Sequence, residues 1–158
     1  MPDEPTYATG GCQCGRVRFR VTEGLGRANL CHCRMCQRAT GNAFAPLVTA
    51  RGVVFEGEPA RFASSNVAER GYCRDCGTPL FYAPLGSDAV ELMIGALDDP
   101  EAARPALHYG IESRLGWLHL ADGLPEYETR PGGLSGTGPG TITSRQHPVP
   151  GEAAEEDR

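Results

Sequence analysis

The chain has 158 residues, of which 40% are hydrophobic, and it carries a formal net charge of -5 with a sequence pI of about 5.4. This length predicts one domain with its own core, and the acidic charge argues against a surface that binds nucleic acid or anionic lipid. The N-terminal residues contain neither a basic run nor an apolar stretch, and no segment reaches the roughly 18–20 apolar residues that a membrane span needs. We therefore expect a cytoplasmic protein without a membrane or nucleic-acid partner.

β-Strand patterns dominate the chain. Polar and apolar side chains alternate over residues 16–21, which is typical of a half-buried strand. Further strand candidates follow at 43–49, 53–55, 79–82 and 89–94. Arg51-Gly52 is expected to form a tight hairpin between two of them. Helical patterns are limited to single turns at 34–39 and 99–103, so the sequence predicts an all-β fold with short helical turns.

Composition divides the chain into three regions. Residues 1–9 are interpreted as an N-terminal extension, and residues 10–130 as one folded domain. Residues 131–158 are rich in Gly, Pro, Ser and Thr and end with acidic side chains. Such a segment buries too little apolar surface to offset its ordering entropy, so we predict a disordered tail.

The seven cysteines of the chain fall into three short clusters. These clusters are Cys12 with Cys14, Cys31 with Cys33 and Cys36, and Cys73 with Cys76. Zinc takes tetrahedral ligands at about 2.3 Å from each sulfur, and a C-x-x-C turn supplies two of them. In a chain without a secretory signal, clustered cysteines indicate metal binding more often than disulfides. All seven are therefore predicted zinc ligands.

Seven ligands divide naturally into four for a closed structural site and three for a catalytic site with an open position. In one partition, the zinc ribbon set Cys33, Cys36, Cys73 and Cys76 closes a site and leaves Cys12, Cys14 and Cys31. In the other, Cys12, Cys14, Cys73 and Cys76 close one site, while Cys31, Cys33 and Cys36 share the second. Spacing leaves both partitions open, although the compact set at positions 31, 33 and 36 best suits a single metal ion.

The clusters lie within longer motifs, which are GGCQCGRVRFRV, CHCRMCQRATGNAF, YCRDCGTPLFY, IGALDDP and GWLHLADGLPEYE. In this order they resemble the glutathione-dependent formaldehyde-activating enzymes, a family grouped with centromere protein V. The resemblance covers nearly the whole predicted domain. It implies an all-β fold in which small antiparallel sheets are arranged like a tent around zinc sites.

The resemblance also implies the second partition. Cys12, Cys14, Cys73 and Cys76 match the family's structural zinc site, and Cys31, Cys33 and Cys36 match its catalytic one, so two zinc ions are expected per chain. The implied activity joins glutathione to formaldehyde and is classed as a carbon–sulfur lyase in reverse. The implied partner is a small-molecule thiol or thiol adduct. Because a shared fold does not fix a substrate, a non-catalytic zinc-stabilised binding module is the alternative.

Several other polar residues accompany the cysteines. Arg34 and Arg38 lie beside the set Cys31, Cys33 and Cys36. They can bind the carboxylates of glutathione, although a solvated surface pair is an equally expected role. His32 is expected to be exposed, with support of the neighbouring metal ligands as its alternative role. His108 and His119 are expected to be structural, with donation to a metal-bound group as the alternative role.

Three aromatic residues and two short turns complete the sequence-based expectations. Phe44, Tyr82 and Trp117 are expected to fill the core, with the lining of a pocket as the alternative. Thr40-Gly41 predicts a turn after the set Cys31, Cys33 and Cys36. Asp98-Asp99 precedes a proline, so these carboxylates are read as turn residues and not as an acid/base pair.

Overall fold

The computed structural model describes residues 5–130 and 141–147. The strands in this part of the chain are β1 (Ala8–Gly11), β2 (Arg18–Cys31), β3 (Ala45–Glu56), β4 (Ala60–Ala63), β5 (Ala68–Tyr72), β6 (Pro79–Pro84), β7 (Ala89–Met93), β8 (His108–Tyr109) and β9 (Glu126–Tyr127). The helices are α1 (Arg34–Thr40) and the single 3-10 turns η1 (Ile94–Ala96), η2 (Pro100–Ala102) and η3 (Ile111–Ser113). None of the described helices is long and apolar enough to cross a membrane.

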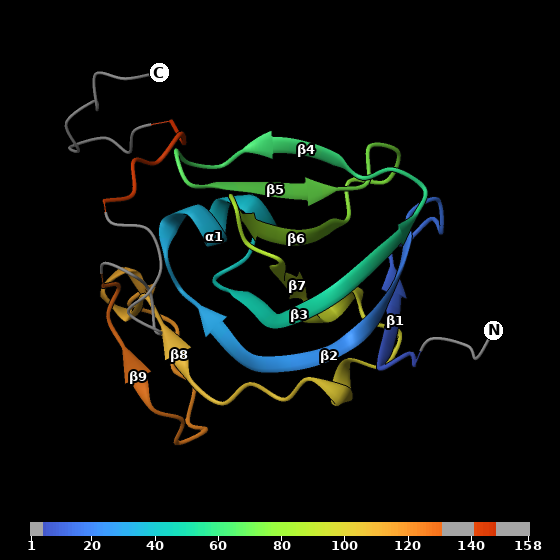
Figure 1. Ribbon diagram of the computed structural model, residues 1–158. Helices are drawn as coiled ribbons and strands as arrows, with labels where there is room; N and C mark the ends of the chain where they lie inside the picture. The colour runs from blue at the N-terminus through green and yellow to red at the C-terminus, as the bar shows by residue number, and fades with distance from the viewer. Residues whose placement is uncertain (1–4, 131–140, 148–158) are drawn as a thin grey trace.

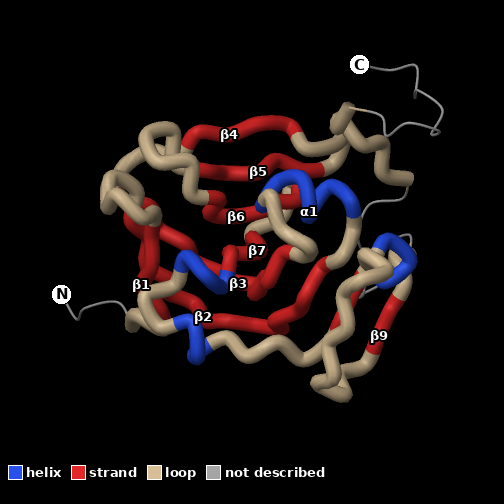
Figure 2. The backbone as a smooth tube through the Cα atoms, turned by 180° about the vertical axis from the view of Figure 1, so that it is seen from behind, coloured by secondary structure: helices blue, strands red, loops and turns tan. Residues whose placement is uncertain are grey.

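All described strands belong to one curved sheet in the order β4-β5-β6-β7-β3-β2-β8-β9, with β1 also paired to β2. Neighbouring strands are antiparallel except at β2–β8 and β8–β9, which are parallel. The sheet curves so that β4 and β5 lie opposite β2, and α1 stands at the open side of this curve (Figures 1 and 2). The all-β prediction is confirmed, but the strands form one continuous mixed sheet instead of several small antiparallel ones.

The hairpin predicted at Arg51-Gly52 is wrong. Strand β3 runs through this position without a break and pairs with β2 along most of its length. Thr22 Oγ1 donates a hydrogen bond of 2.9 Å to the Gly52 carbonyl, and the register of the pair shifts between Val21 and Gly24. Gly52 has φ of 63°, a left-handed conformation open to glycine, so it absorbs a local irregularity where the sequence suggested a reversal.

One face of the sheet carries a continuous apolar core. Phe81 pairs with Leu92, and Leu92 pairs with Val48, so these three buried side chains share one face. Ring contacts extend this core from Phe81 to Phe55 at 5.3 Å and from Phe55 to Phe19 at 6.0 Å. Because side chains alternate along a strand, the intervening residues lie on the opposite face, where Tyr82, Glu91 and Thr49 form a polar row beside apolar neighbours such as Leu80 and Met93.

The aromatic residues expected in the core behave differently from one another. Trp117 is 71% exposed, which contradicts the prediction, because it lies in the turn and loop region after η3 and not on a strand. Phe44 and Tyr82 are half-buried. The ring of Phe44 contacts His32 with a centroid separation of 5.6 Å.

The predicted region boundaries coincide only partly with the elements. β1 begins at Ala8, so two residues of the predicted N-terminal extension pair with β2. Of the predicted disordered tail, residues 131–140 and 148–158 lie outside the described residues. Residues 141–147 contact the loop between β4 and β5: Arg145 N donates to Ser64 O at 3.1 Å, and Asn66 N donates to Thr143 O at 3.2 Å.

Cutting the chain after Arg130 is expected to leave the fold and the metal content intact. The cut removes the few hydrogen bonds to residues 64–66, each of which contributes about 1 kcal/mol net. For a domain of this size, we expect the melting temperature to fall by less than about 6 °C. Thermal melting followed by circular dichroism and elemental analysis of the shortened chain check this, and joint loss of metal and solubility would contradict it.

Candidate metal centres

Four cysteines from two turns of the chain form the four-cysteine cluster. Cys12 and Cys14 follow β1, whereas Cys73 and Cys76 follow β5, and the four sulfurs all lie within 4.8 Å of one another. Neighbouring sulfurs are 3.5 Å apart for Cys12 and Cys14 and 3.7 Å apart for Cys14 and Cys73. Tetrahedral zinc with bonds of 2.3 Å places its sulfurs about 3.8 Å apart, whereas a disulfide is about 2.0 Å long. This donor set therefore fits a metal ion.

Local hydrogen bonds shape the second turn of this cluster. Cys73 N donates to Thr78 O at 2.9 Å, and Gly77 N donates back to Cys73 O at 2.8 Å. Gly77 has φ of 76°, which explains why glycine follows the second cysteine of the turn. The Thr78 hydroxyl lies 3.1 Å from the Cys76 sulfur and is the main cause of a Cys76 pKa lowered to about 5. The turn thus favours the thiolate form that metals bind.

The three-cysteine cluster is formed where a strand passes into a helix. Cys31 ends β2, Cys33 caps α1, and Cys36 lies in its first turn, with all three sulfurs within 4.8 Å of one another. The sulfurs of Cys31 and Cys33 are 3.5 Å apart, and Cys36 N donates to Cys33 Sγ at 3.4 Å. Hydrogen bonds from Cys31 and Cys33, followed by the charge and hydrogen bond of Arg70, hold the pKa of Cys36 well below its usual value.

The structure therefore groups the cysteines as the family resemblance implied. It separates Cys33 and Cys36 from Cys73 and Cys76, which the zinc ribbon partition would have joined. Either cluster could hold a metal ion. The four-cysteine cluster offers a complete tetrahedron, whereas the three-cysteine cluster leaves one coordination position for another ligand.

His32 is completely buried, although it was expected to be exposed. Its backbone N–H donates to Tyr109 O at 2.8 Å, which pairs the segment between two cysteines with β8. Its Nε2 lies 2.9 Å from Nδ1 of His108, which is also buried, and His108 Nε2 lies 3.1 Å from both carboxylate oxygens of Asp122. His32 points away from the metal ligands because adjacent side chains in an extended chain alternate in direction.

The positions of the hydrogens on His32 and His108 follow from the Asp122 carboxylate. Asp122 can only accept, so His108 Nε2 carries the hydrogen and, in the neutral ring, His108 Nδ1 accepts from His32 Nε2. Burial lowers the pKa of His32, which favours its neutral form, and the hydrogen bond from His108 lowers the pKa of Asp122. These hydrogen bonds fix His32 and thereby the backbone between Cys31 and Cys33. His108 thus has the structural role that was expected first.

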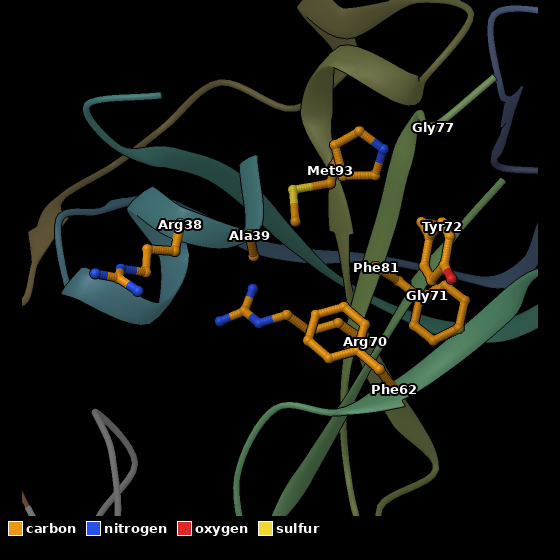
Figure 3. Close-up of a pocket in the computed structure, with 10 residues that line it drawn as sticks. Arg38, Ala39, Phe62, Arg70, Gly71, Tyr72, Gly77, Phe81 and Met93 are labelled. Atoms are coloured by element: carbon orange, nitrogen blue, oxygen red, sulfur yellow. The ribbon is translucent and has the colours of Figure 1, made fainter. Parts of the chain in front are cut away.

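A cavity of about 380 Å³ lies between α1 and the strands β5 and β6 (Figure 3). Arg38 and Ala39 of α1 form part of its wall, and Phe62, Tyr72 and Met93 supply apolar side chains. Arg70 lines the cavity as well, and its side chain extends from β5 toward the helix (Figure 3). Because Arg70 Nη2 also donates to Cys36 Sγ at 3.3 Å, the cavity and the three-cysteine cluster share this residue.

A row of polar residues crosses the sheet from Arg70. Cross-strand pairing places Arg70 opposite Tyr82, Tyr82 opposite Glu91, and Glu91 opposite Thr49. Thr49 Oγ1 donates to Glu91 at 2.8 Å, and Asn29 Nδ2 donates to the same carboxylate at 3.5 Å. Burial raises the pKa of Glu91 and raises that of Tyr82 to about 12, and the nearby Cys36 charge acts in the same direction.

The remaining residues considered in the sequence analysis have contacts of their own or are exposed. Arg34 donates to Gln37 at 2.5 Å within its own helix, and His119 is exposed. Thr40-Gly41 ends α1, as the predicted turn requires, with Thr40 Oγ1 donating to Cys36 O at 2.8 Å. Asp98 is paired with Arg18, whose hydrogen bond lowers the pKa of that carboxyl.

Sequence analysis missed Arg70 and Glu91 as neighbours of the cysteines. Arg70 lies in β5, whose sequence AERGY has few β-forming residues and was not predicted as a strand. Glu91 is a single acidic residue within a predicted apolar strand, and such a residue signals a buried polar contact. That signal was present, but its partners could not be named without the strand order.

Comparison with protein families finds that residues 7–113 match the glutathione-dependent formaldehyde-activating enzymes. A curated relative from Schizosaccharomyces pombe, named as an uncharacterized lyase, is 32% identical over 81 residues. This alignment covers 50% of the chain and 58% of the relative, so it spans a little over half of the relative's length. A crystal structure of a Rhodobacter sphaeroides protein aligns with 75% of this chain and 98% of its own, at 20% identity and a TM-score of 0.45.

Proposed function

The chain belongs to the family of glutathione-dependent formaldehyde-activating enzymes, and we propose that it is a zinc-dependent carbon–sulfur lyase of this type. In the proposed reaction, a thiol such as glutathione adds to formaldehyde. A bond forms between sulfur and the aldehyde carbon, and the thiol proton ends on the aldehyde oxygen. The reverse direction cleaves the same carbon–sulfur bond. The proposed compartment is the cytoplasm.

The observation that carries this proposal is a three-cysteine cluster whose Cys36 contacts Arg70, a residue that lines a cavity. A structural metal site needs four protein ligands, whereas three leave a position for a substrate atom. Zinc bound there would supply Lewis acidity, which lowers the pKa of a thiol or polarises a carbonyl oxygen. The residues that would hold it are Cys31, Cys33 and Cys36, and the four-cysteine cluster would hold the structural zinc.

The polar row supplies groups that can exchange protons near the cluster. The thiol must lose a proton, and the oxygen of the adduct must gain one. Glu91, whose pKa is raised by burial, is suited to hold a proton transiently at its carboxylate. Tyr82, whose pKa is about 12, stays protonated at neutral pH and can donate a hydrogen bond.

The cavity wall supports an anionic thiol as the substrate. Arg38 is exposed at the cavity, and a guanidinium binds carboxylates through paired hydrogen bonds. Glutathione carries two carboxylates and one thiol, so it matches this wall in charge. Arg34, which is engaged with Gln37, is less available for this role than Arg38.

Protein purified without chelator is expected to contain about two zinc ions per chain, because the cysteines form one four-ligand and one three-ligand cluster. Elemental analysis of the parent chain and of Cys31→Ala measures this. The variant should lose about one zinc ion and keep the other.

A single tightly held zinc that Cys31→Ala leaves in place would contradict the proposal. That outcome would favour the alternative function, a non-catalytic module stabilised by the four-cysteine cluster alone.

A further inference from the structure

Arg70 is a buried cation whose surroundings differ from those of an ordinary structural arginine. It is 3% exposed, and its Nε donates to Ser64 Oγ at 2.9 Å. Its guanidinium carbon lies 5.0 Å from the centre of the Tyr82 ring. Among the residues that the structure describes, no carboxylate lies within ion-pair distance of Arg70. The only thiol sulfur that it contacts there is Cys36 Sγ, at 3.3 Å from Nη2.

This environment requires a nearby anion. A buried guanidinium without a counter-charge is strongly unfavourable, and the hydroxyl of Ser64 and the face of Tyr82 offset only part of that cost. Cys36 is the group that can supply a full negative charge, since its sulfur is a hydrogen-bond acceptor for Arg70 when deprotonated. The contact with Cys36 is therefore the one through which Arg70 and the three-cysteine cluster act on each other.

We propose that Arg70 is the positioning residue of the three-cysteine cluster. It holds the Cys36 sulfur in place through Nη2 and balances the charge of the metal-loaded cluster. A divalent ion with three thiolates carries a net charge of -1, which one guanidinium cancels. This role rests on the proposed function, because it needs a metal at Cys31, Cys33 and Cys36.

The charge argument gives the direction of the effect on metal affinity. Without Arg70, the metal-loaded cluster would keep an uncompensated negative charge in a buried position. The hydrogen bond that holds the Cys36 sulfur in place would be lost as well, and a metal-bound sulfur needs a fixed position more than a free one does. Loss of the guanidinium is therefore expected to weaken metal binding at the three-cysteine cluster and leave the four-cysteine cluster unaffected.

Arg70 also reaches the cavity. Its third nitrogen, Nη1, is buried without a hydrogen-bond partner among the described residues, although the side chain lines the cavity (Figure 3). A polar atom in that state is a donor that an oxygen atom of a bound ligand can use. Replacement of Arg70 should consequently change KM for an oxygen-bearing substrate as well as kcat.

The test compares the full-length parent chain with Arg70→Met, Arg70→Gln, Arg70→Lys and Arg61→Met. Arg61 is the matched control, because its guanidinium also lies over a ring, at 4.8 Å from the centre of Phe81, but contacts no cysteine. Graded chelator competition on the metal-loaded proteins, followed by elemental analysis, gives the zinc affinity of each cluster. Cobalt exchanged into the three-cysteine cluster reports its environment through thiolate charge-transfer absorption.

For Arg70→Met and Arg70→Gln, we expect the affinity of the three-cysteine cluster to fall by about 10–100-fold and its cobalt spectrum to shift. Arg70→Lys should recover part of this loss, since it keeps the charge but not the planar fork. Arg61→Met should match the parent. Arg70→Met and Arg70→Gln differ in shape, so if one of them fails to fold, the other still tests the proposal.

Parent-like cobalt spectra and affinities in the uncharged Arg70 variants would overturn this role while leaving the proposed function in place. Absence of any cobalt binding at the three-cysteine cluster of the parent chain would overturn both. Equal weakening at the two clusters would indicate a general structural role for Arg70 and would also contradict the proposal.

Discussion

Cys73→Ser is expected to unfold the domain at temperatures at which the parent chain is folded. Cys73 is completely buried and joins the turn after β5 to the turn after β1 through the four-cysteine cluster. Zinc binding contributes about 10–16 kcal/mol to folding in small zinc-finger peptides, whereas whole domains are stable by only about 5–15 kcal/mol. Loss of even part of that contribution is therefore comparable to the whole free energy of unfolding of such a domain. Thermal melting by circular dichroism should show a large loss of stability.

Cys33→Ser is the matched control for this experiment. It makes the same chemical change, but in the three-cysteine cluster, whose ligands all lie within the single segment from Cys31 to Cys36. A metal ion there joins no distant parts of the chain, so its loss should lower the melting temperature much less. If Cys73→Ser melts like the parent chain, the four-cysteine cluster has no structural role.

The strands that could be predicted from the sequence are those with a clear local pattern. Residues 16–21 alternate in polarity and fall largely within β2, and residues 89–94 correspond closely to β7. The short α1 was also predicted, as a single turn at 34–39, and in the structure Gly41 supplies its C-cap. These features depend on neighbouring residues, which a single sequence displays directly.

Features that depend on strand order could not be predicted in the same way. The contact between Arg70 and Cys36 joins β5 to α1 across 34 positions of sequence, and β5 has no strong strand pattern. His32 was expected to be exposed because nothing near it in sequence indicates the buried partner His108, 76 positions away. The cysteine clusters can be recognised in the sequence because their members are close together in it, whereas the contact of Arg70 with Cys36 depends on strand order.

The position of Tyr82 also depends on strand order and register. Tyr82 was expected to fill the core, yet it is half-buried and lies on the face opposite Phe81, in register with Arg70 and Glu91. A shift of one residue in strand register would have exchanged these faces. Register is set by pairing with β5 and β7, and it therefore decides whether the cysteine cluster meets polar or apolar neighbours.

Cys33→Ala is expected to abolish catalysed turnover while leaving a folded protein that retains the metal of the four-cysteine cluster. Cys33 contributes one of only three sulfurs in its cluster and also caps α1 by accepting from Cys36 N. Two remaining sulfurs hold a metal too weakly and in the wrong geometry. Changes to residues that merely support metal ligands cost about 10–100-fold, so loss of a ligand should reduce the catalysed rate by more than about 100-fold.

The assay for this variant follows formation of S-hydroxymethylglutathione above the spontaneous rate, which must be subtracted because thiols add to formaldehyde unaided. Met35→Ala is the control, since Met35 lies in the same turn of α1 between Cys33 and Cys36 and belongs to neither cysteine cluster. It should keep parent-like turnover, which would show that disturbance of the helix alone does not explain the loss. Another thiol replaces glutathione if the parent chain is inactive with it. Parent-like activity of Cys33→Ala on a substrate that the parent chain turns over would remove the three-cysteine cluster from the reaction.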